Sequence, residues 1–505
     1  MPAPAAGSPM VYLVGAGPGD PGLLTLRAVE CLQRADVVLY DYLVNPAILE
    51  HARPTAALLP LGRRSTGRGL TPDAIADRMI TEAEAGRVVV RLKGGDPCVF
   101  GRGADEELAL RAAGVPYEIV PGITAGLAVA AYGEIPITHH DDASAVALVT
   151  GHERDDKTAS HLDWAALARF PGTLVLYMGV TRAAEWSEAL IAHGKPADTP
   201  VAIVRWCTRA EQQRVHCTLR TAPAVIAERG LRPPAIIVVG DVVAHAPPQS
   251  WFEARPLYGV RVLVPGSPLT SQTLRDRLTR LGADAVIQPA FRIMEPEWPA
   301  VDAALDQLPA YRWLVFSNAA GVDVLLDRLL ARGQDIRRLA GLRIAAIGAG
   351  TADRLARYHL RPDHVPAEFD ATTMTRALGV HAGDRVLQVH AGGGDALTAA
   401  LEAAGAAVDR LAAYQSTDVD APDPDVAEGL AAGEIGWVAI TSSAVARSVV
   451  TLYGDALRGA RFVTVGPLAS ATLRALGHEP AAEAAPATTD GLVAAILEAH
   501  RAPRG

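Results

Sequence analysis

The stretch Val11-Tyr-Leu-Val-Gly-Ala-Gly-Pro-Gly-Asp20 is a short apolar run that leads directly into a glycine-rich turn. The stretches that follow, such as Leu24–Arg34 and Pro72–Ala85, have the hydrophobic spacing of helices. Between them, similar apolar runs recur along the first half of the chain, at Val37–Tyr40, Val88–Leu92, Ala145–Thr150, Leu174–Met178, Val201–Val204 and Ile236–Val239. Alternation of short strands with amphipathic helices predicts an α/β fold with largely parallel sheets.

The composition is typical of a folded globular protein. The 505 residues suffice for three or four compact units, and 50% of them are hydrophobic. A net charge of -9 and an aromatic content of 5% argue against a nucleic-acid-binding surface. The sequence shows no signal peptide, no apolar run of the ~18 residues that span a membrane, and no CxxC pair among its four cysteines. We therefore expect a cytoplasmic protein that binds neither nucleic acid nor membrane.

The second half of the chain contains an internal repeat. Trp313-Leu-Val-Phe-Ser-Asn-Ala-Ala-Gly-Val322 resembles Trp437-Val-Ala-Ile-Thr-Ser-Ser-Ala-Val-Ala446, and Arg343-Ile-Ala-Ala-Ile-Gly348 matches Arg461-Phe-Val-Thr-Val-Gly466. A period of roughly 120 residues is too long for a solenoid repeat and predicts two similar α/β lobes. Because ligands of parallel sheets bind beyond the carboxyl ends of the strands, we expect a site between the lobes.

A Pro-rich segment without periodicity, His245–Pro256, is the best candidate for a linker between the two halves. We expect one domain at 1–250 and a second at 257–505. The second divides into a lobe of about 257–290 plus 419–505 and a lobe of about 295–410.

The first glycine-rich turn on its own suggests a dinucleotide-binding fold. Gly17-Pro-Gly-Asp-Pro-Gly22 fits G-x-G-x-x-G, and Asp41 follows about twenty residues later. The two prolines in the turn, however, remove backbone N–H donors that a pyrophosphate would need. The pattern alone is weak, and a nicotinamide oxidoreductase is the less favoured interpretation.

Several longer motifs point elsewhere. They are Val14-Gly-Ala-Gly-Pro-Gly-Asp20, Val90-Arg-Leu-Lys-Gly-Gly-Asp-Pro97 with Phe100-Gly-Arg-Gly103, Val120-Pro-Gly-Ile-Thr-Ala125, Pro136-Ile-Thr-His139, Leu176-Tyr-Met-Gly179 and Pro234-Ala-Ile-Ile-Val-Val-Gly240. Over about residues 10–245, the chain closely resembles the uroporphyrinogen-III C-methyltransferases of the tetrapyrrole-methylase family. The resemblance implies a two-subdomain fold, a homodimer formed through this half, and double methylation of uroporphyrinogen III to precorrin-2 with S-adenosylmethionine as methyl donor.

The resemblance also implies which residues contact the methyl donor: Pro18, Gly94, Gly95, Asp96, Val99, Thr124, Ala125, Met178 and Cys207. The donor is a sulfonium that carries an adenosine and an amino-acid tail, and glycine turns let the backbone approach such a molecule closely. Cys207 stands where many members of the family have glycine. Met178 could instead be an ordinary core methionine.

Two residues match the proposed acid and base of the family. Asp41 stands at the position of the proton acceptor, although it could be a simple turn aspartate at the end of a strand. Arg63 stands where the family commonly has a lysine as proton donor. Because arginine stays protonated and donates poorly, we interpret Arg63 as an anchor for substrate carboxylates. We expect no metal site, because His139 and His140 have no third ligand at metal-binding spacing.

Residues 259–500 resemble uroporphyrinogen-III synthases, which are two-lobed α/β proteins. The motifs that carry this resemblance are Phe316-Ser-Asn-Ala-Ala-Gly-Val322, Ile347-Gly-Ala-Gly-Thr-Ala352, Ala413-Tyr-Gln-Ser416, Thr441-Ser-Ser443, Val465-Gly-Pro467 and Ala487-Thr-Thr-Asp-Gly-Leu492. The family closes hydroxymethylbilane with inversion of ring D and uses no cofactor. The resemblance implies that Tyr414 donates to the departing hydroxyl, unless it is only a packed aromatic at the lobe hinge. Substrate carboxylates would be bound by Ser317, Thr351, Thr441 and Ser442.

Together the two halves predict a bifunctional enzyme of tetrapyrrole biosynthesis, on the sirohaem or cobalamin branch, that acts on small-molecule tetrapyrroles. Three positions in the second half differ from the family pattern: Val264-Pro-Gly266 replaces T-R-P, His390 stands where arginine is common, and Ala469 replaces threonine. The alternative is therefore a methyltransferase that carries a non-catalytic tetrapyrrole-binding module.

Overall fold

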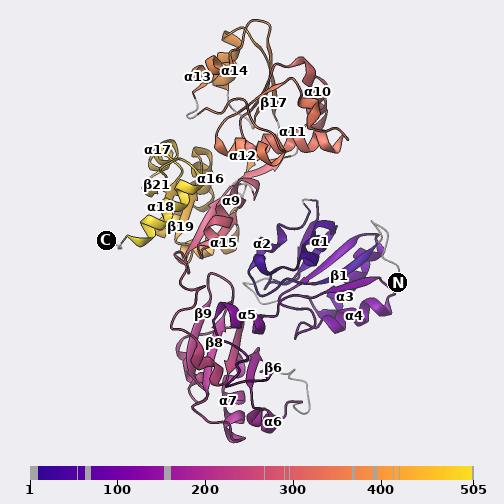
Figure 1. Ribbon diagram of the computed structural model, residues 1–505, viewed down its shortest axis with the longest axis vertical. Coiled ribbons are helices and arrows are strands. Elements are labelled where there is room, and N and C mark those ends of the chain that lie inside the picture. Colours follow the sequence, from indigo (N-terminus) through magenta and orange to yellow (C-terminus); the bar gives the residue numbers. More distant parts are fainter. Residues whose placement is uncertain are drawn as a thin grey trace. The chain divides into compact units, whose positions relative to one another are not determined.

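The computed structural model divides the chain into two compact units, Met1–Gly259 and Val260–Gly505 (Figure 1). The residues it describes are 9–53, 55–62, 70–152, 161–266, 268–288, 291–294, 296–366, 370–390, 395–412, 415–419 and 421–502.

The first sheet of the first unit is parallel throughout its described strands, in the order β3-β2-β4-β1-β5. The strands are β1 (Met10–Gly15), β2 (Val37–Tyr40), β3 (Ala57–Pro60), β4 (Val88–Lys93) and β5 (Tyr117–Val120). Helix α1 (Leu26–Arg34) packs on one face, while α3 (Pro72–Glu84) and α4 (Gly103–Ala112) pack on the other. Along β1, Tyr12 and Val14 face α1, whereas Val11 and Leu13 face α3 and α4. Strands buried on both faces explain the uninterrupted apolar runs in the sequence.

The second sheet of this unit, in the order β6-β7-β10-β8-β9, is mixed. Its strands are β6 (Val146–Thr150), β7 (Thr173–Tyr177), β8 (Pro200–Arg205), β9 (Gln213–Thr218) and β10 (Ala235–Val239). Only β6 and β7 run parallel among the described strands, and the other neighbours are antiparallel. The expectation of parallel strands is therefore wrong for most of this sheet. The connection from β8 to β9 is too short for a crossover helix and makes an antiparallel pair instead.

Helices cover both faces of this second sheet. One face carries α6 (Trp164–Arg169), α7 (Ala183–Ala192) and α8 (Ala222–Glu228). The other face carries α5 (Ala125–Tyr132), which directly follows the first sheet in the chain, and the 3-10 helix η3 (Asp241–His245). Helix α5 thus joins the two sheets by packing the residues after β5 against the second sheet.

The segment expected to be a linker belongs to the core of the first unit. Phe252 is 1% exposed and Leu257 is fully buried, and Arg214 forms an ion pair with Glu253 at 2.9 Å. The segment does lack helix and strand beyond His245, as the prolines require. Prolines prevent regular structure but do not prevent burial, so the unit ends at Gly259, after the Pro-rich stretch.

The second unit contains two larger parallel sheets and a short antiparallel pair. One sheet, in the order β12-β11-β19-β20-β21, is built from β11 (Arg261–Pro265), β12 (Asp284–Gln288), β19 (Trp437–Ile440), β20 (Arg461–Thr464) and β21 (Pro480–Glu483). The other, in the order β15-β14-β16-β17, is built from β14 (Trp313–Phe316), β15 (Arg343–Ala346), β16 (Arg385–His390) and β17 (Ala407–Ala412). The chain passes between them through β13 (Phe291–Met294) and β18 (Gln415–Asp418), which pair with each other.

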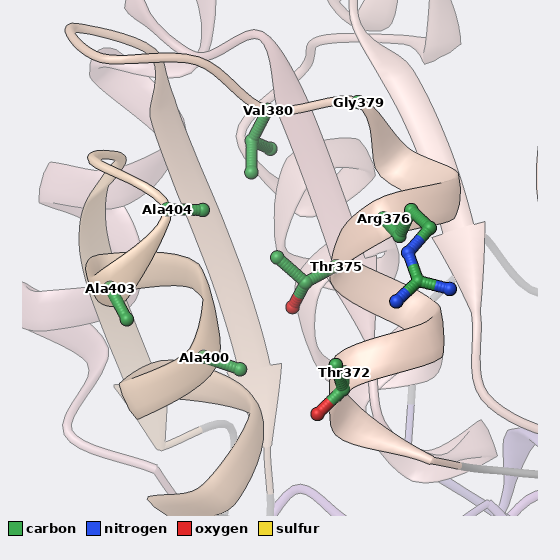
Figure 2. Close-up of a pocket in the computed structure, with 8 residues that line it drawn as sticks. All are labelled: Thr372, Thr375, Arg376, Gly379, Val380, Ala400, Ala403 and Ala404. Carbon is green, nitrogen blue, oxygen red and sulfur yellow. The ribbon is translucent and has the colours of Figure 1, made fainter.

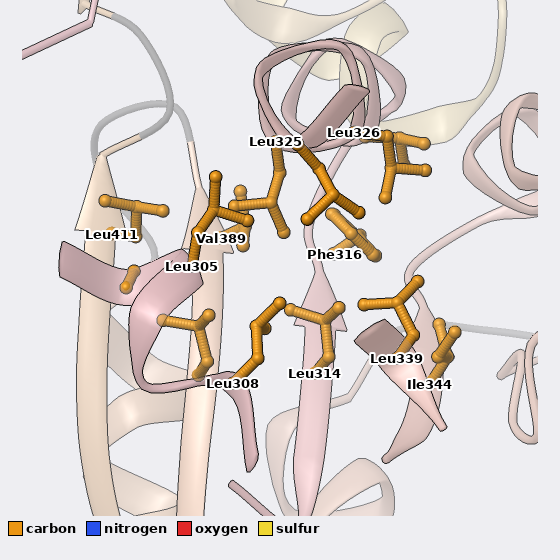
Figure 3. Close-up of a cluster of buried hydrophobic side chains, with 14 of the residues drawn as sticks. Leu305, Leu308, Leu314, Phe316, Leu325, Leu326, Leu339, Ile344, Val389 and Leu411 are labelled. Atoms are coloured by element: carbon orange, nitrogen blue, oxygen red, sulfur yellow. The ribbon is translucent and has the colours of Figure 1, made fainter. Parts of the chain in front are cut away.

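Each of these two sheets has its own hydrophobic core. In the lobe of β14, Figure 3 shows Leu314, Phe316 and Val389 of the sheet against Leu305 of α10 (Trp298–Asp306) and Leu325 of α11 (Ala319–Ala331), all of them fully buried. In the other lobe, α15 (Pro424–Ala431), α16 (Ser443–Tyr453) and α17 (Pro467–Ala475) contribute to a separate cluster. The predicted two-lobed α/β fold is confirmed.

The sequence repeat corresponds to a structural repeat. Trp313 pairs with Arg343 across β14 and β15, and the guanidinium lies 5.6 Å from the indole centroid. Trp437 and Arg461 repeat this arrangement across β19 and β20, at 4.2 Å. Such cation–π contacts fix the same register in both lobes.

None of the described helices combines the length and the apolarity that crossing a bilayer requires.

Candidate functional site

Three glycine-rich turns of the first sheet pack backbone against backbone. Gly17 and Gly95 exchange two hydrogen bonds between their backbone groups, at 3.1 and 2.8 Å. A Cβ added to Gly122 would lie 2.2 Å from the carbonyl oxygen of Gly95, and one added to Gly15 would lie 2.5 Å from the nitrogen of Gly122. Gly95 also has a φ of +70°. Glycine is therefore required where the turns after β1, β4 and β5 meet.

Asp96 ties two of these turns together through its carboxylate. Its Oδ1 accepts from the backbone N–H of Cys98 at 2.7 Å, and its Oδ2 accepts from that of Gly122 at 3.0 Å. Each carboxylate oxygen thus accepts a charge-assisted hydrogen bond that shapes the turns. In the same turns Pro18 and Gly94 are half-buried. Val99 packs against the buried cluster that α5 and η3 form with the second sheet, called the α5 cluster here, which includes Ala128, Val129, Val175, Val238 and Val242.

The start of α5 connects these turns to the second sheet. The hydroxyls of Thr124 and Tyr177 lie 2.8 Å apart, and the Tyr177 hydroxyl accepts from the backbone N–H of Gly126 at 2.9 Å. Burial raises the pKa of Tyr177, so the phenol stays neutral and remains able to donate. Ala125 packs beside this contact, and the Phe100 ring lies 4.8 Å from the Tyr177 ring.

Several residues in the loops after β4, β7 and β8 have left-handed backbone conformations. Phe100 and Arg102 after β4, Met178 after β7, and Trp206 and Thr208 after β8 all have φ values between 50° and 72°. Such strain costs of order 1–3 kcal/mol per residue and clusters at functional sites. Met178 is 47% exposed, so it is not a core methionine.

The loop after β8 is hydrogen-bonded to the glycine-rich turn after β1. The backbone N–H of Asp20 donates to the Thr208 hydroxyl at 3.0 Å, and the Tyr132 hydroxyl donates to the Asp20 carboxylate at 2.8 Å. Cys207, next to Thr208, is 5% exposed and packs in the α5 cluster, where burial raises the pKa of its thiol. The Cys207 side chain is thus part of the packing between α5 and the second sheet.

Asp41 lies directly after β2, beside a buried network of charges. Arg91 donates from Nη2 to Oδ1 of Asp41 at 2.6 Å and from Nε to Oε1 of Glu106 at 3.0 Å. Lys93 donates to the same Glu106 oxygen at 2.7 Å. Exposed fractions of 3% for the Arg91 side chain and 4% for that of Lys93 contrast with 30% for Asp41. Asp41 is thus the accessible end of a buried network.

Arg91 and Lys93 belong to a motif that is visible in the sequence, whereas no sequence motif points to Glu106. Two cations two residues apart on a buried strand require buried anions, because an unpaired buried charge is strongly destabilising. Burial, and next the charge of Arg91, lower the pKa of Lys93. That requirement was the signal that could have located Glu106.

Two predicted catalytic residues, Arg63 and Tyr414, lie outside the described residues.

In the second unit, Ser317 follows β14, and Thr441 and Ser442 follow β19. Ser442 caps α16 by accepting from the backbone N–H of Val445 at 3.2 Å. Strand ends followed by helix N-termini provide backbone N–H donors for anions. Thr351 differs, because its buried hydroxyl donates its proton to the carbonyl of Ile347 at 2.8 Å.

A groove of about 480 Å³ lies between α13 (Ala371–Leu378) and α14 (Asp395–Ala403) (Figure 2). Ala400, Ala403 and Ala404 form one side, and Thr372 and Thr375 lie on the other. The Thr375 hydroxyl already donates to the Ala371 carbonyl. None of the predicted substrate-binding residues lines this groove within the described parts of the chain, so it does not support the predicted chemistry.

The sequence predicts no metal site, because His139 and His140 have no third ligand at metal-binding spacing, but the fold brings further potential ligand atoms close to His139. Asp142 and His245 each place one potential ligand atom near His139, with all three atoms within 4.8 Å of one another. His245 is 103 residues away from Asp142 in the sequence, so short-range spacing could not reveal the group.

Comparison with known proteins shows the family. Residues 10–223 match the model of the tetrapyrrole (corrin/porphyrin) methylases, and residues 272–494 match that of uroporphyrinogen-III synthase HemD. The porphyrin biosynthesis protein HemD of Ruminiclostridium josui is 32% identical over 93% of this chain and 92% of its own length. A uroporphyrinogen-III C-methyltransferase of Bacillus subtilis (strain 168) is 39% identical over 67% of this chain and 69% of its own length. A Thermus thermophilus uroporphyrin-III C-methyltransferase, crystallised with S-adenyl homocysteine, is 40% identical over 46% of this chain and 99% of its own, with a TM-score of 0.40.

Both resemblances found in the sequence are confirmed by these matches, one in each half. The relative from Ruminiclostridium josui aligns across both halves, so their order along the chain is shared as well. The chain belongs to the family of porphyrin biosynthesis proteins in which a tetrapyrrole methylase domain precedes a uroporphyrinogen-III synthase domain.

Proposed function

We propose that this chain catalyses two consecutive steps. The second unit closes hydroxymethylbilane to uroporphyrinogen III, and the first unit methylates that product twice to precorrin-2, on the sirohaem or cobalamin branch. The observation that carries the proposal is the presence of both domains on one chain, with Asp41 beside the glycine turns of the first. The first unit would also form a homodimer.

The turns of the first unit suit S-adenosylmethionine. Gly94 and Gly95 let the backbone approach a ligand, and a Cβ at Gly94 would meet the side chain of Leu43 at 3.3 Å. Backbone groups of these turns and of Thr124 and Ala125 would hold the adenosine and the amino-acid tail, with Pro18, Asp96, Val99, Met178 and Cys207 around them. The bound donor would supply an electrophilic methyl group.

Asp41 is the proposed base. Attack of a pyrrole carbon on the methyl group leaves a cationic ring, which must lose a proton. The Asp41 carboxylate is held at Oδ1 by Arg91 and is 30% exposed, so it can accept that proton while its orientation is fixed. Arg63 would bind substrate carboxylates.

Ring closure in the second unit needs confinement of a reactive intermediate and loss of a hydroxyl. Ser317, Thr441 and Ser442 would bind substrate carboxylates with hydroxyls and helix N-terminal N–H groups, which fixes the open chain for closure. Tyr414 would donate to the departing hydroxyl, and no cofactor is required. Thr351 is the weakest of the four proposed carboxylate ligands because its hydroxyl proton is already used.

A second candidate, a non-catalytic tetrapyrrole-binding module, is favoured by the replacements at Val264-Pro-Gly266, His390 and Ala469. The discriminating experiment supplies the full-length chain with hydroxymethylbilane and no methyl donor, then oxidises the product and separates the porphyrin isomers. Bifunctionality predicts the type III isomer, and Tyr414→Phe should slow its formation. Type I alone, the product of unassisted closure, would establish the binding module.

A further inference from the structure

We propose that His139, Asp142 and His245 form a binding site for one divalent metal ion of the zinc class. Nδ1 of His139 lies 3.1 Å from Oδ2 of Asp142, and Nε2 of His245 lies 2.5 Å from the same oxygen. Zinc bonds of about 2.0–2.2 Å to nitrogen and oxygen place tetrahedral ligands roughly 3.3 Å apart. The three ligand atoms are thus close enough for one ion, and the imidazole rings of His139 and His245, now stacked with centroids 4.1 Å apart, would rotate to direct both nitrogens at it.

The backbone holds both halves of this cluster in place. His139 and Ala143 exchange two backbone hydrogen bonds, both of 2.9 Å, which fixes His139 and Asp142 on one tight turn. Ala143 is buried in the α5 cluster, and so are Val242 and Val243 of η3, the helix that ends at His245. Ligands carried by two segments anchored in the same core lose little entropy when an ion binds.

The donor set suits zinc. Two imidazole nitrogens and one carboxylate are typical zinc ligands, and three protein ligands leave a further position for water. The exposed fractions are 24% for the side chain of His139, 31% for Asp142 and 42% for His245, so an ion can enter from solvent.

A bound ion would link two parts of the first unit. His139 and Asp142 lie on the connection from α5 to β6, and His245 ends η3, which follows β10 of the second sheet. The ion would cross-link that connection to the end of η3. It would also stabilise the folded unit by mass action, because the unfolded chain does not hold the three groups together.

The test titrates zinc into the untagged full-length protein by calorimetry and repeats the titration with cobalt, whose visible spectrum reports imidazole coordination. We expect one ion per chain, a higher melting temperature with zinc, and at least tenfold weaker binding in Asp142→Asn and in His245→Ala. His193→Ala, at the end of α7 in the same unit, is the matched control and should bind as the wild type does.

His140 and Asp141 form a second group of potential metal ligands with His139, so a variant of His140 tests which of the two groups binds the ion. The proposal expects His140→Ala to retain binding. Loss of binding in His140→Ala but not in His245→Ala would overturn it. So would the absence of zinc binding by a wild-type protein that is folded by circular dichroism, because the cluster would then be only a hydrogen-bonded group.

Discussion

Arg91 Nη2 lies 2.6 Å from Oδ1 of Asp41, so the proposed base of methyl transfer is oriented by a guanidinium that is almost completely buried. The same guanidinium donates to Glu106, and the Lys93 ammonium donates to the same Glu106 oxygen. The network thus extends from the interior of the first sheet to Asp41, whose side chain is 30% exposed against 8% for Glu106. It gives each of these residues a distinct, measurable role.

Asp41→Asn should retain S-adenosylmethionine binding and lose methyl transfer. The substitution preserves size and removes basicity, and a general base typically contributes about 100- to 10,000-fold to the rate. Turnover with uroporphyrinogen III and calorimetry with the methyl donor measure the two properties separately. Asp73→Asn, an exposed carboxylate on α3, is the control. A turnover within about threefold of wild type would exclude Asp41 as the base.

Arg91→Lys tests positioning. Lysine keeps the buried charge but has one nitrogen in place of the separate Nη2 and Nε atoms that bind Asp41 and Glu106, so the carboxylate loses its fixed orientation. We expect kcat to fall about 10- to 100-fold while KM for the methyl donor is unchanged. Arg34→Lys, on the exposed end of α1, should leave both constants as they are. An unchanged kcat in a folded Arg91→Lys protein would show that Arg91 serves stability alone.

Lys93→Met tests the buried cation through pH. Because burial lowers the pKa of Lys93 in the folded state, the unfolded chain binds that proton more tightly. The contribution of Lys93 to stability should therefore rise as pH increases from the folded pKa toward the unfolded value of about 10.4. Urea unfolding of wild type and variant at pH 7.5 and 9.5 measures this. The wild type should gain stability relative to Lys93→Met at the higher pH, and a relative loss would contradict the lowered pKa.

The buried strands were predictable from the sequence, whereas several of the more exposed strands were not. The runs at Val11–Val14, Val37–Tyr40 and Val88–Leu92 become central strands because helices cover both of their faces. The strands β5 and β9 are at least partly exposed and lack a continuous apolar run, so they were missed. Strand β3 was missed although its four residues are apolar, and it is largely exposed. Strand direction in the second sheet was also missed, because apolar runs do not encode direction.

Residues of the site were predictable from the sequence only where they belong to a recognisable motif. The glycine turns and Asp41 were identified, yet the Asp20–Thr208 bond spans 188 residues and the His245–Asp142 contact spans 103. Pairings across such distances depend on the tertiary fold. The prediction of a linker at His245–Pro256 failed for a similar reason. Phe252 is buried because it packs in the same cluster as α5, which is distant in the sequence.

Two substitutions of Ser442 distinguish its role as a helix cap from its proposed role in substrate binding. Ser442→Ala removes the cap on α16, which should cost about 0.5–2 kcal/mol of stability, and should raise KM for hydroxymethylbilane. Ser442→Asn restores the cap but not the hydroxyl, so stability should recover while KM stays high. Thermal unfolding and initial rates of closure distinguish the two. A KM that recovers together with stability would assign Ser442 to capping only.

The most direct measurement of bifunctionality supplies the full-length chain with hydroxymethylbilane and S-adenosylmethionine together. The product is identified by mass spectrometry and isomer analysis, and S-adenosylhomocysteine is counted against it. We predict a dimethylated type III product with two S-adenosylhomocysteine molecules for each ring. A type I ring, obtained from a preparation that still methylates added uroporphyrinogen III, would contradict the proposal that the second unit is a synthase.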